Sequence, residues 1–136
     1  MSDTKPQPIL DQVSREWFDA AREGKLLIQR CAACERFQFY PRAHCIHCFS
    51  GRPEWHEASG KGRLHTFSVV YQTPNPEFAD DCPYVLAIVD LEEGVRMTSR
   101  LVDVAEEDIA CDMPVTVTFG GWDELSLPFF TADGSA

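Results

Sequence analysis

Four cysteines in two closely spaced pairs constrain this chain more than any other feature. Cys31 and Cys34 form one CxxC pair, Cys45 and Cys48 form a second, and ten residues separate the pairs. This spacing lets two short turns present four thiolates tetrahedrally to one metal ion, as in a zinc ribbon. Disulfides are disfavoured because no export signal precedes the cysteines. The pattern predicts a closed, structural Zn²⁺ site, with a rubredoxin-like iron site as the alternative because thiolates bind both metals.

The other chemistry-bearing residues indicate no catalytic group. Cys82 and Cys111 lie outside the pairs, and the sequence places no base beside either of them, as a nucleophile requires. We expect both to be buried or incidental thiols. His44 and His47 lie beside the ligands and have the chemistry to replace one. We expect them instead to form a polar or cationic rim with Arg30, Arg36 and Arg42. The sequence contains no recognisable Ser/His/Asp grouping and no glycine-rich phosphate loop, so it indicates no catalytic grouping.

The N-terminal region predicts one amphipathic helix. Leu10, Val13 and Trp17 follow helical spacing, Phe18 widens the apolar stripe, and Gly24 is placed like a helix C-cap. Whether the two aromatic residues pack on the protein's own core or join a partner interface stays open. We expect a helical segment over residues 1–25, the zinc ribbon over 26–58, a barrel domain over 59–131 and a frayed tail over 132–136.

Past Trp55 the pattern is mainly β. Alternating apolar residues and turn signals predict strands over about 63–71, 84–91, 95–102, 115–119 and 126–130, with a hairpin turn at 92–94. A short helical connection is expected over 103–108, and 72–83 is expected to be an exposed, mobile loop. Five strands with a helical insert between the third and fourth predict an OB-fold barrel.

Charge is distributed unevenly along the chain. The formal net charge is −10, but residues 1–21 carry −2, residues 22–63 carry +4 and residues 64–136 carry −12. Even with four zinc-bound thiolates, the middle segment is the one place where an anionic ligand is expected to dock. No apolar run approaches the roughly 20 residues that span a bilayer. We therefore expect a cytoplasmic protein that contacts no membrane.

The residues also resemble a known family, the acyl-CoA-associated zinc-ribbon and OB-fold proteins once labelled domain of unknown function thirty-five. The order of the matching pieces carries the resemblance: Trp17-Phe18, Glu23-Gly24-Lys25-Leu26, Gln29-Arg30-Cys31, Tyr40-Pro41-Arg42, Trp55, Gly60-Lys-Gly62, Pro83 to Asp90, Leu91-Glu-Glu-Gly94 and Met113-Pro114-Val115. Glu35 and Asp112 stand where the family often has glycine, and Phe49, after Cys48, also departs from the family's pattern. These three residues put the local turn geometry in question.

The resemblance implies a non-catalytic partner of thiolase-like, ketosynthase-like, aldolase or hydratase enzymes in a hetero-oligomer, one that assists complex assembly and acyl-CoA binding. The catalytic residues would then belong to the other chain. Within the basic middle segment, Arg30, Arg36, Arg42 and Arg52 are candidates to contact the phosphates of coenzyme A.

Two other functions are considered. Zinc ribbons and OB barrels also bind single-stranded nucleic acid, with Phe67 and Tyr71 available for stacking, but the charge of −12 over residues 64–136 opposes phosphate binding. A free-standing electron carrier with iron at the four cysteines would be a coloured protein. We expect neither nucleic acid as a partner nor electron transfer as the function.

Overall fold

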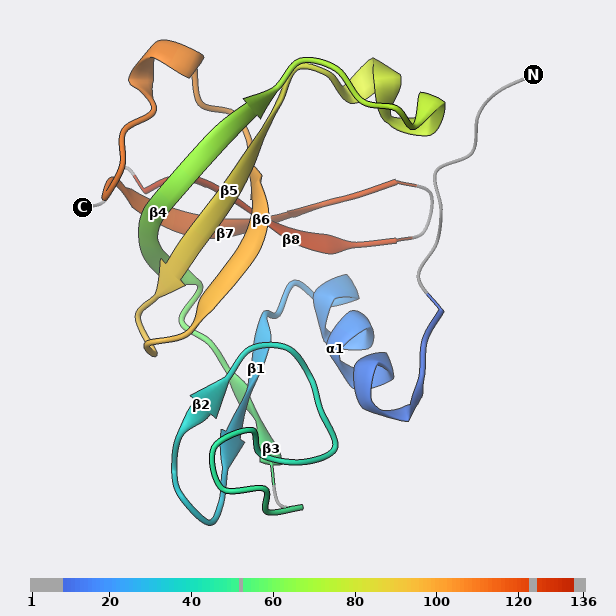
Figure 1. Ribbon diagram of the computed structural model, residues 1–136, viewed down its shortest axis with the longest axis vertical. Helices are drawn as coiled ribbons and strands as arrows, with labels where there is room; N and C mark the ends of the chain where they lie inside the picture. The colour runs from blue at the N-terminus through green and yellow to red at the C-terminus, as the bar shows by residue number, and fades with distance from the viewer. Residues whose placement is uncertain (1–8, 52, 123–124, 134–136) are drawn as a thin grey trace.

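A helix, a small three-stranded sheet and a closed five-stranded barrel follow one another along the chain (Figure 1). The computed structural model describes residues 9–51, 53–122 and 125–133. The small sheet lies at one end of the molecule, the barrel at the other, and the helix beside both. No helix within this described part is long and apolar enough to cross a membrane.

Helix α1 (Gln12–Arg22) is closed by its own sequence at both ends. Ser14 donates its N–H to the carboxylate of Asp11 at 2.7 Å, and its hydroxyl accepts the N–H of Asp11, which is a capping box. At the other end Gly24 donates its N–H to the carbonyl of Ala21 and holds a φ of 80°, a conformation that favours glycine. The predicted helix and its C-cap are confirmed.

The small sheet has the order β2–β1–β3, with all pairs antiparallel. Its strands are β1 (Leu27–Cys31), β2 (Phe37–Gln38) and β3 (Pro53–Glu57). The first cysteine therefore ends the central strand, and the first CxxC turn leads directly into β2. The sequence did not predict β3, because its residues alternate too weakly in hydrophobicity to stand out from a loop.

The barrel has the strand order β4–β5–β6–β8–β7 and closes where β4 pairs with β7. Its strands are β4 (Lys61–Val70), β5 (Tyr84–Leu91), β6 (Arg96–Leu101), β7 (Pro114–Gly120) and β8 (Leu127–Ala132). The one parallel pairing joins β6 to β8 at Leu101 and Phe130. Five strands, closure and the short helix η2 (Glu106–Asp108) before the fourth strand confirm the predicted OB fold.

One hydrophobic core spans the ribbon and the barrel. Buried side chains of the barrel pack in a single cluster with buried side chains that precede it in the chain. The barrel contributes Leu64, Ala87, Val89, Leu91, Met97, Leu101, Val115 and Phe130, and the preceding segments contribute Leu26, Ile28, Phe39 and Ala58. The two parts therefore share apolar burial, and each stabilises the other.

The segment expected to be a mobile loop over 72–83 is exposed over most of its length but has structure of its own. It contains the short helix η1 (Pro76–Asp81). Arg100 donates to the carboxylate of Asp81 at 3.2 Å, and the ring of Phe78 packs edge-on against that of Trp122. These contacts attach the segment to β6 and to the β7–β8 connection.

The ends of two other predicted segments differ in detail from the expectation. Tyr71 lies just beyond β4, is largely exposed, and donates its hydroxyl to Glu106. Of the tail expected over 132–136, Ala132 ends β8 and Asp133 donates its N–H to Pro114. Residues 134–136 lie outside the described residues.

Candidate metal centre and adjoining grooves

The four paired cysteines converge on one point at the end of the ribbon. Their sulfurs all lie within 4.8 Å of one another, with 3.7 Å between Cys31 and Cys48 and 3.6 Å between Cys34 and Cys45. Four sulfurs at about 2.3 Å from a tetrahedral ion lie about 3.8 Å apart, whereas a disulfide needs about 2.05 Å. The donor set and its spacing fit one tetrahedral ion.

Backbone N–H groups of the two turns point at the sulfurs. The N–H groups of Cys34 and Ala33 outweigh desolvation and lower the pKa of Cys31 to about 6. The N–H of Ser50 lowers the pKa of Cys48, but desolvation and the neighbouring thiols outweigh it and raise the pKa to about 11. The surroundings of Cys31 and Cys48 thus shift the pKa values of these two thiols in opposite directions.

Two buried glutamines hold the segment that joins the cysteine pairs. Gln29 accepts the N–H of Arg42 at 2.9 Å and donates to the carbonyl of the same residue at 3.0 Å. Gln38 accepts the N–H of Ile46 at 2.9 Å, and it donates to the Gln29 side chain at 2.6 Å and to the carbonyl of His44 at 3.3 Å. This network was not predictable from the sequence, because it needs the β1–β2 pairing that sets Gln29 opposite Gln38.

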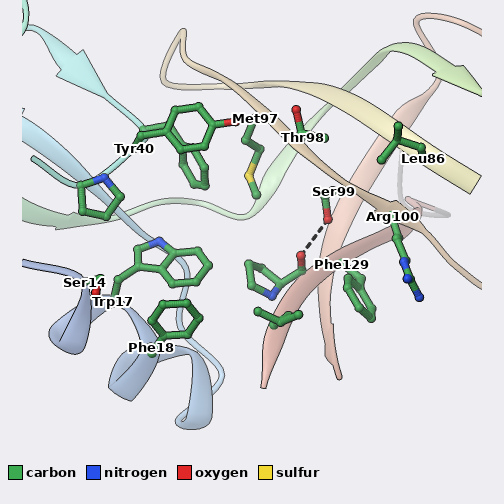
Figure 2. A pocket seen from close by; sticks show the side chains of 14 residues that line it. Ser14, Trp17, Phe18, Tyr40, Leu86, Met97, Thr98, Ser99, Arg100 and Phe129 are labelled. Atoms are coloured by element: carbon green, nitrogen blue, oxygen red, sulfur yellow. Dashed lines mark hydrogen bonds between the residues drawn. The ribbon is translucent and has the colours of Figure 1, made fainter. Parts of the chain in front are cut away.

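An apolar groove of about 440 Å³ lies where α1, the ribbon and the barrel meet (Figure 2). Trp17, Phe39 and Tyr40 follow one another along it in edge-to-face contacts, with ring centroids 6.1 and 4.8 Å apart. Figure 2 places Tyr40 and Arg100 on opposite sides of the groove. Its lining residues are Ser14, Trp17, Phe18, Phe39, Tyr40, Pro41, Leu86, Met97, Thr98, Ser99, Arg100, Leu127, Pro128 and Phe129.

Both aromatic residues of α1 lie at the apolar groove. Trp17 packs against the core cluster and donates its indole N–H to the carbonyl of Leu27 at 2.9 Å. Phe18 packs edge-on against Trp17 with centroids 4.8 Å apart, and both line the apolar groove. Ser126 also donates to the carbonyl of Ala21 at 3.0 Å. The helix is therefore attached to the ribbon by Trp17 and to the barrel by Ser126.

A second, more polar groove of about 280 Å³ lies between the ribbon and the β5–β6 hairpin, and we call it the basic groove. Arg96 donates to Asp90 at 2.7 Å, and this hydrogen bond lowers the pKa of the Asp90 carboxyl. Phe39 and Tyr40 line both grooves. The residues of the basic groove are Phe37, Gln38, Phe39, Tyr40, Arg42, Ile46, His47, Gly94, Val95 and Arg96.

The arginines expected to contact phosphate are not gathered at one place. Arg42 lines the basic groove, and Arg96, which the sequence did not single out, lies across from it on the hairpin. Arg30 pairs with Glu35 at 3.5 Å on the ribbon, and Arg36 is exposed just before β2. Arg52 lies outside the described residues. The charge pattern did not predict a role for Arg96, because this residue lies far from the basic middle segment in the sequence.

The two cysteines outside the pairs lie apart from the cluster. Cys82 is half-buried, and its thiol lies 3.8 Å from the carbonyl of Phe78, which anchors the end of η1. Cys111 is exposed. His47 places a ring nitrogen 3.2 Å from the carbonyl of Phe37, as part of a polar rim around the cluster.

Comparison with known proteins identifies both halves of the chain. Residues 18–54 match the model of the ChsH2 rubredoxin-like zinc ribbon domain, and residues 55–120 match that of the ChsH2 C-terminal OB-fold domain. A DUF35 domain-containing scaffold protein of Methanothermobacter thermautotrophicus is 38% identical over 112 residues, which are 82% of this chain and 84% of that protein.

A larger protein and a solved structure extend the likeness. A probable enoyl-CoA hydratase alpha subunit of Thermomonospora curvata is 39% identical over 127 residues, or 93% of this chain, but this chain spans only 39% of its length. A chain in the structure titled Ltp2-ChsH2(DUF35) aldolase superposes with a TM-score of 0.83 at 38% identity, covering 93% of this chain and 98% of that one. This chain belongs to the DUF35 family of ChsH2-type zinc-ribbon and OB-fold proteins.

Proposed function

We propose that this protein is a non-catalytic accessory subunit of an acyl-CoA-processing enzyme, and that it assists assembly of the complex and binding of the acyl-CoA. The likeness to a chain of the Ltp2-ChsH2(DUF35) aldolase carries the proposal, because it extends over almost the full length of both chains. The hydratase subunit name of one relative and the scaffold name of another point the same way. The reacting groups then belong to a thiolase-like, hydratase or aldolase partner.

We further propose that the cysteine cluster holds one structural Zn²⁺ and that the protein works in the cytoplasm, where its thiols stay reduced. Four thiolates complete a tetrahedral shell, so no position remains for a reacting water. Elemental analysis of the purified protein is expected to give one zinc per chain. A coloured preparation that contains iron instead would contradict the assignment.

The basic groove supports the acyl-CoA part of the proposal. Arg42, in the connection between β2 and β3, and Arg96, at the start of β6, both line it, and Tyr40 lines both this groove and the apolar groove. Guanidinium groups bind phosphate through two parallel hydrogen bonds. Arg30 and Arg36 lie outside the groove, so we assign the main phosphate contact to Arg42. Residues 64–136 carry −12, which favours this local site over a nucleic-acid surface.

Co-purification tests the proposal. Each acyl-CoA enzyme found by a search of the neighbouring genes is co-expressed, untagged, with the tagged chain. We expect a stable complex in which the enzyme has a higher melting temperature and higher turnover than alone. If the chain neither retains such an enzyme nor changes its stability or activity, the accessory role is wrong.

A further inference from the structure

The turns that begin at Cys31 and Cys45 have the same backbone geometry. In each turn the third residue donates its N–H to the sulfur of the first cysteine at 3.3 Å. The residue after each pair closes the turn, because Glu35 and Phe49 hold φ values of 66° and 62° and donate their N–H groups to the carbonyl of the first cysteine. Metal binding therefore makes the same demands on the backbone of both turns.

The side chains of the two turns differ. Between and after its cysteines, the first turn has two alanines and a glutamate, and the second has an isoleucine, a histidine and a phenylalanine. Ile46 is 50% exposed and Phe49 is 80% exposed, and we call these two side chains the apolar knuckle. Phe49 also holds a positive φ, which destabilises a residue with a Cβ. Because the first turn reaches the same geometry with small and polar residues, neither the metal nor the turn accounts for the apolar knuckle.

The stretch of chain around the apolar knuckle lacks acidic residues. Residues 36–50 contain Arg36 and Arg42 but no Asp or Glu, although the whole chain has 22 acidic residues. Arg42 and Ile46 line the same groove, so a guanidinium lies beside the knuckle. Four thiolates on a divalent metal reduce the charge of residues 22–63 from +4 to about +2, so this part of the chain stays cationic. Protein surfaces that bind each other place opposite charges together, so an apolar pocket bordered by carboxylates fits the knuckle.

The position of the apolar knuckle leaves it accessible to another protein. It belongs to the connection between β2 and β3, in the ribbon at one end of the molecule (Figure 1). Phe49 is not among the described residues that line either groove, and Ile46 lines the basic groove alone. A protein that buries Phe49 therefore need not cover the apolar groove.

Building on the proposed accessory function, we propose that the apolar knuckle is the contact through which this chain docks to its acyl-CoA enzyme. Phe49 enters an apolar pocket of the enzyme, and carboxylates at the border of that pocket face the arginines of the ribbon. A large aromatic side chain that becomes buried at the centre of an interface supplies much of the binding free energy. Burial of Phe49 in the complex then compensates for its exposure and its positive φ in the lone chain.

Affinity measurements with the full-length, zinc-loaded chain test this docking site. The probe is the acyl-CoA enzyme that co-purifies with the unaltered chain, immobilised for biolayer interferometry. Phe49→Gly removes the ring and relieves the positive φ, and we expect it to bind about thirtyfold more weakly, as loss of a central aromatic contact does. Glu35→Gly relieves the same backbone conformation in the first turn and is expected to bind as tightly as the unaltered chain. Zinc content and the urea midpoint establish that both variants are folded.

Two charged replacements test the carboxylate border of the pocket. Phe49→Lys and Phe49→Glu both remove the ring at an exposed position, and they differ in the sign of the charge that they bring to the enzyme. Both are expected to bind more weakly than the unaltered chain, with Phe49→Lys at least about tenfold tighter than Phe49→Glu. Equal binding of the two variants, or tighter binding by Phe49→Glu, would contradict an acidic border.

The possible failures are distinguishable. If an enzyme binds the unaltered chain and Phe49→Gly equally well, or if Glu35→Gly loses as much affinity as Phe49→Gly, the docking site is wrong and the accessory function stands. If no acyl-CoA enzyme binds the unaltered chain, the accessory function fails, and the docking site fails with it. Sedimentation of the chain alone is expected to show a monomer. Self-association that Phe49→Gly abolishes would assign the apolar knuckle to a second copy of this chain and overturn the proposal.

Discussion

Two residues other than glycine adopt a positive φ where they close the two cysteine turns. Glu35 and Phe49 hold φ values of 66° and 62°, and they donate their N–H groups to the carbonyls of Cys31 and Cys45 at 2.8 and 2.9 Å. A residue with a Cβ pays about 1–2 kcal/mol in this region. Phe49 regains little of that cost within the chain, because it is 80% exposed.

Replacing Phe49 is expected to show this cost. In the zinc-loaded protein, Phe49→Gly should be more stable than Phe49→Ala by about 0.5–1 kcal/mol, because the gain in the left-handed region exceeds the added entropy of the unfolded chain. The urea midpoint at unchanged m-value measures the difference. Ala33→Gly, in the first turn and without a positive φ, is the control and should lose stability. A less stable Phe49→Gly than Phe49→Ala would contradict the argument.

The buried glutamine pair makes the second residue-level prediction. Gln29 and Gln38 are each 4% exposed. Gln38→Leu removes the partner of the Ile46 N–H and of the His44 carbonyl, whereas the side-chain oxygen of Gln29 keeps the N–H of Arg42. Each polar group left unmet inside the ribbon costs about 1–3 kcal/mol. We expect Gln38→Leu to lower the free energy of unfolding by about 1 kcal/mol or more and to release the bound metal faster to a chelator. Gln72→Leu, at an exposed position, should change neither quantity; equal behaviour of the two variants would refute a positioning role.

At the level of elements, the sequence predicted that α1 forms, but it did not predict which strands α1 contacts. Helical spacing and Gly24 determine the helix α1 locally. In the turn before β7, Asp112 holds a φ of 68°, so the structure retains this turn without a glycine. The groove wall needs α1 to lie against both β1 and β8, which depends on contacts between residues 10 and 105 positions apart. No local pattern carries that information, so neither groove was predictable.

The attachments of α1 are separately testable. Trp17→Phe removes the bond to Leu27, and Ser126→Ala removes the bond to Ala21. Each is expected to cost about 1 kcal/mol and to raise amide hydrogen exchange throughout α1 while β5 stays protected. Glu16→Gln, on the exposed face of the helix, serves as the control. Unchanged amide exchange of α1 in the double variant Trp17→Phe/Ser126→Ala would mean that apolar packing alone holds the helix.

For the whole molecule, periodicity was enough to predict the barrel because one face of each strand is buried. Val89, Val115 and Phe130 are fully buried in it, and alternation reports that burial directly. The charge count located the basic segment but missed Arg96, which β5–β6 pairing brings opposite the ribbon from the acidic part of the chain. Composition by segment therefore predicts which part is basic and fails where the fold brings distant charges together.

The shared core makes the response to metal removal a property of the whole molecule. Leu26, Ile28 and Phe39 belong to the same apolar cluster as the barrel residues, so loss of the bound metal is expected to reduce the stability of the barrel as well as to loosen the cysteine turns. The barrel keeps its closed hydrogen-bonded ladder and should remain folded at 25 °C. Acyl-CoA binding should be lost first, because the basic groove is built partly from the segment between the cysteine pairs.

Chelator titration with amide exchange as the readout resolves these steps. We expect residues 37–49 to lose protection at a chelator concentration where β4 to β8 remain protected and the urea midpoint has already fallen. Cys48→Ser should reproduce this state without chelator, and Cys111→Ser, outside the cluster, should resemble the unaltered protein. If ribbon and barrel amides lose protection together in both the chelated protein and Cys48→Ser, the two parts fold as one unit. The Zn²⁺ site would then stabilise the entire chain, because the core that Leu26 and Ile28 share with the barrel would not form without it.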